Sequence, residues 1–165
     1  MDVAAIADNF RDIIKNHYFD MRGRAGRGQF WWFVLANLIA SLLAHFVGSI
    51  IHLPLGELYN LAVLLPVMSL GARRLQDTGR DGKLVWALLL LTAVTQVIGI
   101  FMALTWFLAG FFAALFAPGL GLAAILTLIV AVVLIWFWCQ PGDPGPNAYG
   151  SVPPSFDPTR PTPSP

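Results

Sequence analysis

Residues 84–140 form a run of 57 positions that contains no Asp, Glu, Lys or Arg. A transmembrane helix takes about 20 apolar residues, so this run is too long for one membrane span and long enough for two. The same bias holds across the 165-residue chain, of which 57% is hydrophobic and 12% is charged. Soluble domains carry about 25% charged residues. The composition therefore excludes an ordinary soluble enzyme and a disordered chain, and it predicts an integral membrane protein.

The apolar runs predict an all-α fold, a polytopic membrane helix bundle with four transmembrane helices. The expected spans are at about residues 30–51, 56–74, 84–105 and 120–139. Each is close to the roughly 20 residues that cross a hydrocarbon core of about 30 Å. Pro118 and Gly119 are expected to break the long uncharged run. Residues 106–117 are left open as an extension of the third span, a re-entrant piece or an interfacial piece.

Two segments outside the spans complete the domain organisation. Residues 1–29 are a cytoplasmic amphipathic and basic segment, and residues 141–165 are a proline-rich cytoplasmic tail. In residues 1–18, apolar side chains recur at spacings of three and four, which indicates an amphipathic helix that lies in the membrane interface or against the bundle. A solvated helical leader is the alternative. Nine of the twelve prolines fall in the tail, so residues 153–165 are expected to be extended and disordered.

The basic residues predict the topology. Five lie before the first span, four lie between the second and third spans, and one lies in the tail: Arg11, Lys15, Arg22, Arg24, Arg27, Arg73, Arg74, Arg80, Lys83 and Arg160. With four spans, all ten fall on one side of the membrane. The positive-inside rule then places both termini of this multi-pass chain in the cytoplasm.

Two basic clusters stand at the ends of spans, in residues 22–32 and residues 73–83. The first precedes a helix N-terminus, where free N–H groups and arginines suit a phosphate. Its alternative role is a topology anchor in anionic lipid. In the second cluster, Asp77 lies within helical reach of Arg73 and Arg74 if the helix continues that far, and Gly79 is the expected C′ residue that ends it. Snorkelling arginines with one local ion pair are the alternative there.

Four pieces of the chain follow one another in a set order. They are Tyr18-Phe19 with Gly23-Arg24-Ala25-x-Arg27-x-x-Phe30-Trp31, Leu65-Pro66 through Arg73-Arg74-Leu75 and Asp77-Thr78-Gly79, then Gly82, then Pro141-Gly142-x-x-Gly145-x-Asn147-x-Tyr149-Gly150. Together they resemble the DUF805 family of small bacterial inner-membrane proteins, over about residues 18–150. The resemblance implies a small multi-span membrane protein and supplies no established activity. The chain departs from the family at Gln76, where a histidine is usual, and at Asp81 and Lys83, where serine and tryptophan are usual.

A hairpin of the first two spans returns both basic clusters to one membrane face, and the segment after the fourth span reaches the same face. The hypothesis is that Arg24, Arg27, Arg73 and Arg74 bind an anion there, most simply a lipid headgroup. The alternative is an internal polar clasp in which Asp77 is shared among the arginines and only orients helices. The residues assigned either to that polar clasp or to the family-like motifs are Asp77, Gly79, Gly82, Asn147 and Tyr149.

A polar stripe marks the first span, with Asn37, Ser41 and His45 at spacings of four. Such a stripe lines a pathway or joins helices through hydrogen bonds. We expect the second role, with three polar residues of the third span as partners: Thr92, Thr95 and Gln96. The pathway reading supports the alternative function, a small oligomeric transporter or channel component.

Enzymatic and metal-binding roles are disfavoured by the residue types that the expected spans lack. Within the expected spans there is no carboxylate pair, no Ser/His/Asp set and no metal motif, so we predict no enzymatic activity, no metal and no cofactor. A net charge of +1 gives no electrostatic reason to expect a nucleic acid partner, and we predict none. The expected partners are membrane lipids and, through self-association, a homo-oligomer. The leading functional hypothesis is an integral membrane protein whose cytoplasmic-face arginine motifs bind anionic lipid or a partner.

Overall fold

Helices make up almost the whole of the computed structural model, which describes residues 2–104 and 106–159. The elements are α1 (Val3–Asn16), α2 (Arg27–Ile51), α3 (Leu55–Asp77), the short 3-10 helix η1 (Gly82–Leu84), α4 (Val85–Leu104) and α5 (Trp106–Cys139). The described residues hold no strand, only an isolated bridge between Asn147 and Gly150. The predicted all-α class is confirmed.

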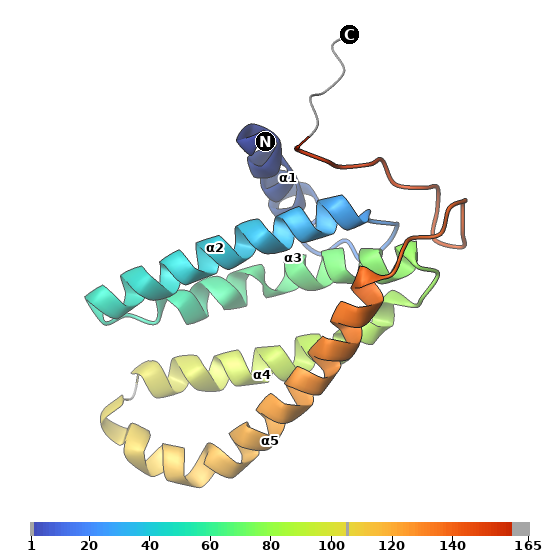
Figure 1. Cartoon of the computed structure of the whole chain (residues 1–165). Helices are drawn as coiled ribbons and strands as arrows, with labels where there is room; N and C mark the ends of the chain where they lie inside the picture. Colours follow the sequence, from blue (N-terminus) through green and yellow to red (C-terminus); the bar gives the residue numbers. More distant parts are fainter. Residues whose placement is uncertain (1, 105, 160–165) are drawn as a thin grey trace.

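The helices pair as two antiparallel hairpins, α2 with α3 and α4 with α5, and α3 packs against α4 between them (Figure 1). Helix α1 lies at the end where α2 begins and α3 ends, and the tail crosses the same end. Among the described residues, three helical stretches are long and apolar enough to span a membrane: Arg27–Ile51, Leu55–Asp77 and Gly121–Cys139. A shorter apolar stretch, Gly82–Thr95, opens the second hairpin.

The outer faces of the long helices are apolar and exposed. Leu42 and Phe46 of α2 are 61% and 65% exposed, and Leu128 of α5 is 65% exposed. Soluble monomers rarely leave contiguous apolar patches of this extent open to water. The apolar faces are therefore surfaces for lipid, as the composition predicts.

The predicted break at Pro118 and Gly119 is wrong, because α5 is one helix of 34 residues that runs through both. The boundary between the third and fourth helices falls instead between Leu104 and Trp106. Residues 106–117 thus form the first part of α5 and do not extend α4. A proline removes one backbone hydrogen bond and bends a helix, and transmembrane helices tolerate this. Figure 1 shows α5 curving in its first half, and Pro66 is likewise enclosed in α3.

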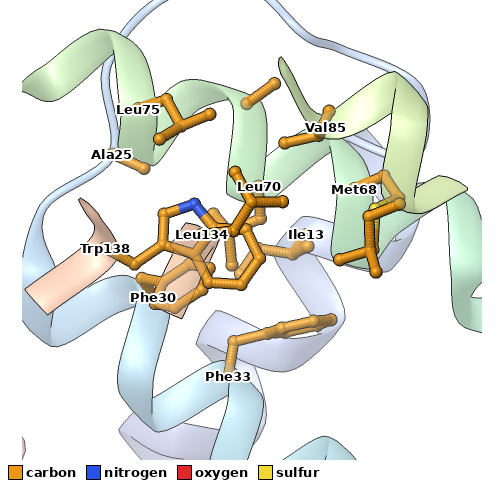
Figure 2. Close-up of a cluster of buried hydrophobic side chains, with 12 residues drawn as sticks. Ile13, Ala25, Phe30, Phe33, Met68, Leu70, Leu75, Val85, Leu134 and Trp138 are labelled. Atoms are coloured by element: carbon orange, nitrogen blue, oxygen red, sulfur yellow. The ribbon is translucent and has the colours of Figure 1, made fainter. Parts of the chain in front are cut away.

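The core gathers at one end of the bundle. Figure 2 shows the Trp138 ring of α5 against Phe30 of α2, with Phe33, Leu70 and Ile13 around them. The Phe30 and Trp138 ring centroids are 4.8 Å apart, and Trp138 Nε1 donates to Gly71 O at 3.0 Å. This core ties α1, both hairpins and the last turn of α5 together close to the basic residues.

The tail lies against the rest of the chain where it is described. Residues 153–159 contain no helix or strand, as their prolines predict, but they turn at residues 158–159 and so are not extended throughout. The disorder expected for them stays a prediction. Asp2 N–H donates to Pro158 O at 2.7 Å, and Phe156 O occupies the space that a side chain at Gly28 would fill. Prolines remove N–H donors but leave carbonyls free to accept. In the tail, Pro158 O accepts from the N-terminal segment, and Phe156 O lies against the start of α2. Residues 160–165, also predicted disordered, lie outside the described residues.

Candidate functional site

The last turn of α3 ends in a Schellman motif, which sets the position of Asp77. Arg80 N–H donates to Leu75 O at 3.0 Å, Gly79 N–H donates to Gln76 O at 3.1 Å, and Gly79 has a φ of +73°. These bonds satisfy carbonyls that a helix end leaves free, and glycine adopts this φ without strain. The prediction that the helix continues through both arginines and stops before Gly79 is confirmed.

Arg24 connects the segment before α2 to Asp77, 53 residues further along the chain. Its Nε and Nη2 both lie 2.9 Å from Asp77 Oδ1. Its N–H groups also donate to carbonyls after α5, Nη2 to Asp143 O at 2.7 Å and Nη1 to Gly145 O at 2.6 Å. A weaker bond from Nη1 reaches Gly150 O at 3.3 Å. The Arg24 side chain is 2% exposed, so protein groups and not water balance its charge.

Arg74 reaches Asp77 from its own helix and also holds the end of α5. Its Nη1 donates to Asp77 Oδ2, its Nε donates to Trp138 O at 3.0 Å, and its Nη2 donates to Gln140 O. The last carbonyls of a helix have no partner within the helix and carry partial negative charge. Arg74 is fully buried and acts as the cap of α5. We call Arg24, Arg74 and Asp77, with the carbonyls that they bind, the clasp.

The closing segment, residues 141–150, is bonded to the backbone and side chains around Asp77. Asp143 N–H donates to Asp77 O at 2.8 Å. Asn147 Nδ2 donates to Gln76 O at 2.9 Å and to Asp143 Oδ2 at 2.8 Å, while Asn147 Oδ1 accepts from Tyr149 N–H at 2.9 Å. The family-like motifs around Arg24, around Asp77 and in the closing segment therefore meet at one place, although they are far apart in the sequence.

Two glycines allow the chain to approach closely at this place. A Cβ at Gly142 would collide with the Asp77 carboxylate, and a Cβ at Gly82 would lie 2.7 Å from Gln76 Nε2 and 3.0 Å from Ala72 Cβ. Real Cβ atoms do not approach other atoms this closely without a shift. Gly145, by contrast, has nothing within 4 Å of such a Cβ, although it stands in the same segment.

The clasp leaves out Arg73 and Arg27. Arg73 is 8% exposed, and its Nε and Nη1 have no hydrogen-bond partner among the described residues. Its charge acts on Asp20, in the loop between α1 and α2. Burial raises the pKa of Asp20, but the Arg22 N–H, the His17 ring and the charge of Arg73 outweigh it, so the pKa lies below its usual value. Arg27 is exposed in the first turn of α2, beside a cavity of about 380 Å³ that the tail also lines.

A larger cleft of about 790 Å³ lies next to the clasp. Its walls come from the α1–α2 loop, the end of α3, η1, the first turn of α4 and the closing segment. The lining includes Gln76, Asp81, Lys83, Trp86 and Tyr149. This size is that of a small-ligand site.

The polar stripe of α2 bonds to α3. Ser41 Oγ donates to Asn60 Oδ1 at 2.8 Å, and Tyr59 OH donates to Asn37 Oδ1 at 2.8 Å. His45 Nδ1 lies 2.8 Å from Ser41 O in its own helix. The stripe therefore joins helices, as expected, but through α3.

The partners expected on the third span are wrong for both threonines. Thr92 Oγ1 donates to Leu88 O at 2.6 Å, and Thr95 Oγ1 donates to Leu91 O at 3.1 Å. Hydroxyls in a helix commonly bond to the carbonyl four residues earlier, which leaves them no need for another helix. The side chain of Gln96 lies outside the described residues.

Sequence reasoning did not find the carbonyl acceptors or Asp143. The carbonyls that surround the two arginines belong to residues 138, 140, 143, 145 and 150, and backbone groups carry no signal in a sequence. Asp143 has a signal, because it is the only acid in residues 141–150 and follows a Pro-Gly pair.

The fold and this site define an all-helical integral membrane protein in which two basic motifs and a closing segment meet at one end of the bundle. Residues 18–151 match the DUF805 family, whose description reads "Protein of unknown function (DUF805)". The chain belongs to this family.

Two curated relatives from Escherichia coli (strain K12) are similar to the chain along most of its length. It is 32% identical to "Inner membrane protein YhaI" over 147 residues, which cover 87% of this chain and 93% of that protein. It is 27% identical to "Inner membrane protein YhaH" over 153 residues, which cover 88% of this chain and 96% of that protein. No solved structure matches the chain. Family and relatives agree with the apolar helices in making this an inner-membrane protein.

Proposed function

We propose that this chain is a non-enzymatic, four-span protein of the cytoplasmic membrane, and that its cytoplasmic face binds the phosphate groups of lipid headgroups. In this proposal α4 also spans the membrane, as the third of the four spans in chain order, because 20 residues at 1.5 Å each reach about 30 Å. Both termini are cytoplasmic, which puts all ten basic residues on one side. Helix α1 lies in the interface, which suits Val3 at 67% exposure and Ile13 in the core.

One observation carries the proposed role of the clasp: the Arg24 side chain is 2% exposed and is bound to Asp77 and to three carbonyls of the closing segment. A guanidinium with this set of partners has no free N–H group to offer a lipid phosphate. Arg24 and Arg74 therefore build the cytoplasmic face by holding the closing segment and the end of α5. The internal clasp accounts for them better than direct anion binding does.

Lipid binding in this proposal falls to the exposed bases around the clasp. Arg22, Arg27 and Lys83 are exposed, and the guanidinium groups of Arg22 and Arg27 have no partner among the described residues. Bases next to a span bind anionic headgroups, each contributing about 1 kcal/mol near the surface. An acid–base enzyme is disfavoured because Asp77 already accepts bonds from two arginines.

The transporter or channel alternative depends on an open polar stripe in α2. The described bonds occupy Asn37 and Ser41 with side chains of α3, which leaves the stripe inside a helix pair. His45 is the last residue of the stripe, and its Nε2 lies 3.9 Å from Oε1 of Glu57 in α3. No observation on the described residues favours this alternative, so we do not propose it.

Native mass spectrometry of the full chain released in mild detergent tests the proposal, with Arg24→Gln and Arg27→Gln as matched charge-neutral variants. We expect Arg27→Gln to fold like wild type and to retain less phospholipid. Arg24→Gln is expected to lose folded protein, because it leaves Asp77 Oδ1 and three carbonyls without their donor. Normal folding of Arg24→Gln together with a loss of bound lipid would contradict the clasp. Absence of any retained phospholipid on wild type would overturn the lipid-binding function.

A further inference from the structure

The cleft of about 790 Å³ beside the clasp carries charges of both signs. Arg22 and Lys83 line it together with Asp20 and Asp81, so its formal charges cancel. The Lys83 side chain is 83% exposed and the Asp81 side chain is 56% exposed, with Lys83 Nζ and Asp81 Oδ2 3.8 Å apart. Both groups are thus held near each other and are still open to a ligand. A ligand matched to this lining has one positive and one negative group of its own.

The cleft also contains an acceptor that the protein leaves unused. Gln76 is 8% exposed, its Nε2 donates to Met21 O at 2.8 Å, and its Oε1 has no hydrogen-bond partner among the described residues. The bond to Met21 O fixes the orientation of the amide, because reversing it would bring two oxygens together. The oxygen itself is buried, so a ligand N–H donor satisfies it only after a shift of the cleft wall.

The position of the cleft indicates that the ligand comes from the membrane. Phe19 and Trp86 line it, their ring centroids are 6.3 Å apart, and they are 56% and 44% exposed. Trp86 stands in the first turn of α4, where an apolar helix begins. Aromatic rings at the end of a span lie at the level of lipid headgroups. A headgroup therefore enters the cleft while its acyl chains stay along the apolar face of α4.

We propose that this cleft binds the headgroup of a zwitterionic phospholipid that carries a primary ammonium, that is, phosphoethanolamine linked to a diacylglycerol. The phosphate is bound by Lys83 and Arg22, and the ammonium N–H groups donate to Asp81 and, after a shift of the cleft wall, to the buried acceptor of Gln76. Phosphatidylcholine has no N–H donor, so it leaves the acceptors unpaired. Phosphatidylglycerol has no cation and brings its charge next to two carboxylates. This inference rests on the proposed lipid-binding function and narrows it to one site and one headgroup.

The test measures retention of dioctanoyl lipids by the full chain in native mass spectrometry, at equal concentrations of the ethanolamine, N-methyl, N,N-dimethyl and choline forms and of phosphatidylglycerol. We expect retention to fall with each methyl group, to roughly tenfold less for the choline form, the loss expected for a charged hydrogen bond. This series needs no variant. Free phosphoethanolamine and inorganic phosphate are added in separate arms, and we expect weaker binding of both, because they lack the chains that lie along α4.

Two exposed positions identify the groups involved. Asp81→Asn is expected to bring the ethanolamine form down to the level of the choline form, and Lys83→Gln to weaken all five lipids. Lys15→Gln, an exposed change on α1, is the control and should alter nothing. Equal retention of all five lipids, or an unchanged preference in Asp81→Asn, would overturn the inference. If Arg27→Gln still lowers their retention in that case, the proposed function stands and only this site fails.

Discussion

The two halves of α3 differ in how much protein surrounds them. In residues 55–65 only Gly56 and Val63 are buried, whereas every residue from 68 to 77 is buried. The better-packed half is the one that holds Arg73, Arg74 and Asp77. In a soluble protein, charged residues are mostly exposed and apolar ones are inside.

The membrane explains this reversal. Lipid solvates an apolar side chain as well as another apolar side chain does, so the first half of α3 needs few protein neighbours. A charge at the end of a span has no comparable solvent in the hydrocarbon and requires partners from the protein. Protein contacts therefore concentrate where the charges are. The predictions below compare the two halves, from the largest expected effect to the smallest.

Removing Asp77 should have the largest effect. Asp77→Ala leaves two buried arginines without their carboxylate, and breaking a buried ion pair in this way costs about 3–5 kcal/mol. Asp8→Ala is the control, because the Asp8 side chain is 71% exposed and pairs, among the described residues, only with the exposed Arg11 on α1, and it should cost under about 1 kcal/mol. The free energy of unfolding in detergent, measured by circular dichroism during titration with SDS, compares the two. Equal costs for both changes would remove the difference between the halves.

A methyl group at Gly142 should destabilise the clasp without removing any charge. In Gly142→Ala the new Cβ meets the Asp77 carboxylate, and overpacking of this kind costs about 1–3 kcal/mol. Gly145→Ala adds the same methyl group into open space in the same segment. We expect limited proteolysis to cut residues 141–159 faster in Gly142→Ala only. Identical digestion of the two variants would contradict the close approach of Gly142 to Asp77.

The polar bonds of the less buried half should contribute less. Ser41→Ala removes the bond to Asn60, and hydrogen bonds between membrane helices contribute about 0.6 kcal/mol on average. Ser49→Ala is the control, because Ser49 Oγ donates to Phe46 O in its own helix. The same SDS titration measures both. A cost for Ser41→Ala as large as that of Asp77→Ala would show that the two halves are held with equal strength.

The smallest effect should be a pH dependence of stability that comes from Asp20, next to the buried half of α3. The pKa of Asp20 in the folded chain lies below 3.8, so its ionised form stabilises the fold fully above that pH. This contribution is lost as the pH falls through the lower folded value. The difference in thermal unfolding midpoint between wild type and Asp20→Asn should therefore be present at pH 7 and vanish in strong acid. A difference that is constant with pH would show that the charge of Asp20 has no part in stability.

Local patterns in the sequence predicted much of the fold, and long-range contacts account for most of what they did not predict. The end of α2 at Ile51 follows from the turn residues Pro54 and Gly56, and the end of α3 at Asp77 follows from Gly79; both signals are readable without any partner. The continuity of α5 through Pro118 is different, because a proline permits either a break or a bend. The packing of Pro158 against Asp2 could not be predicted either, since it joins the two ends of the chain through backbone groups.

The residues that form the candidate site were predicted from the sequence, but their hydrogen-bond partners were not. The motifs around Arg24, Arg74, Asp77 and Asn147 were expected at one face, and both an anion site and a clasp fitted that expectation. The choice between these roles depends on carbonyls of the closing segment, which any sequence would supply. The cleft beside the clasp was not predicted, because its lining comes from four stretches that are separated along the chain, residues 19–23, 76, 81–86 and 148–149.

By itself, the sequence determined that the chain is a helical membrane protein and where its basic residues gather, because hydropathy and helix length are local properties. Only the tertiary structure decided which of those residues have partners. Arg73 and Arg74 are adjacent, but side chains one residue apart on a helix point about 100° away from each other. That rotation directs Arg74 to Asp77 and the end of α5, and it leaves Arg73 buried with two nitrogens that have no partner in the described part of the chain. The partners of a buried charge are thus decided by the direction in which its side chain points into the folded bundle.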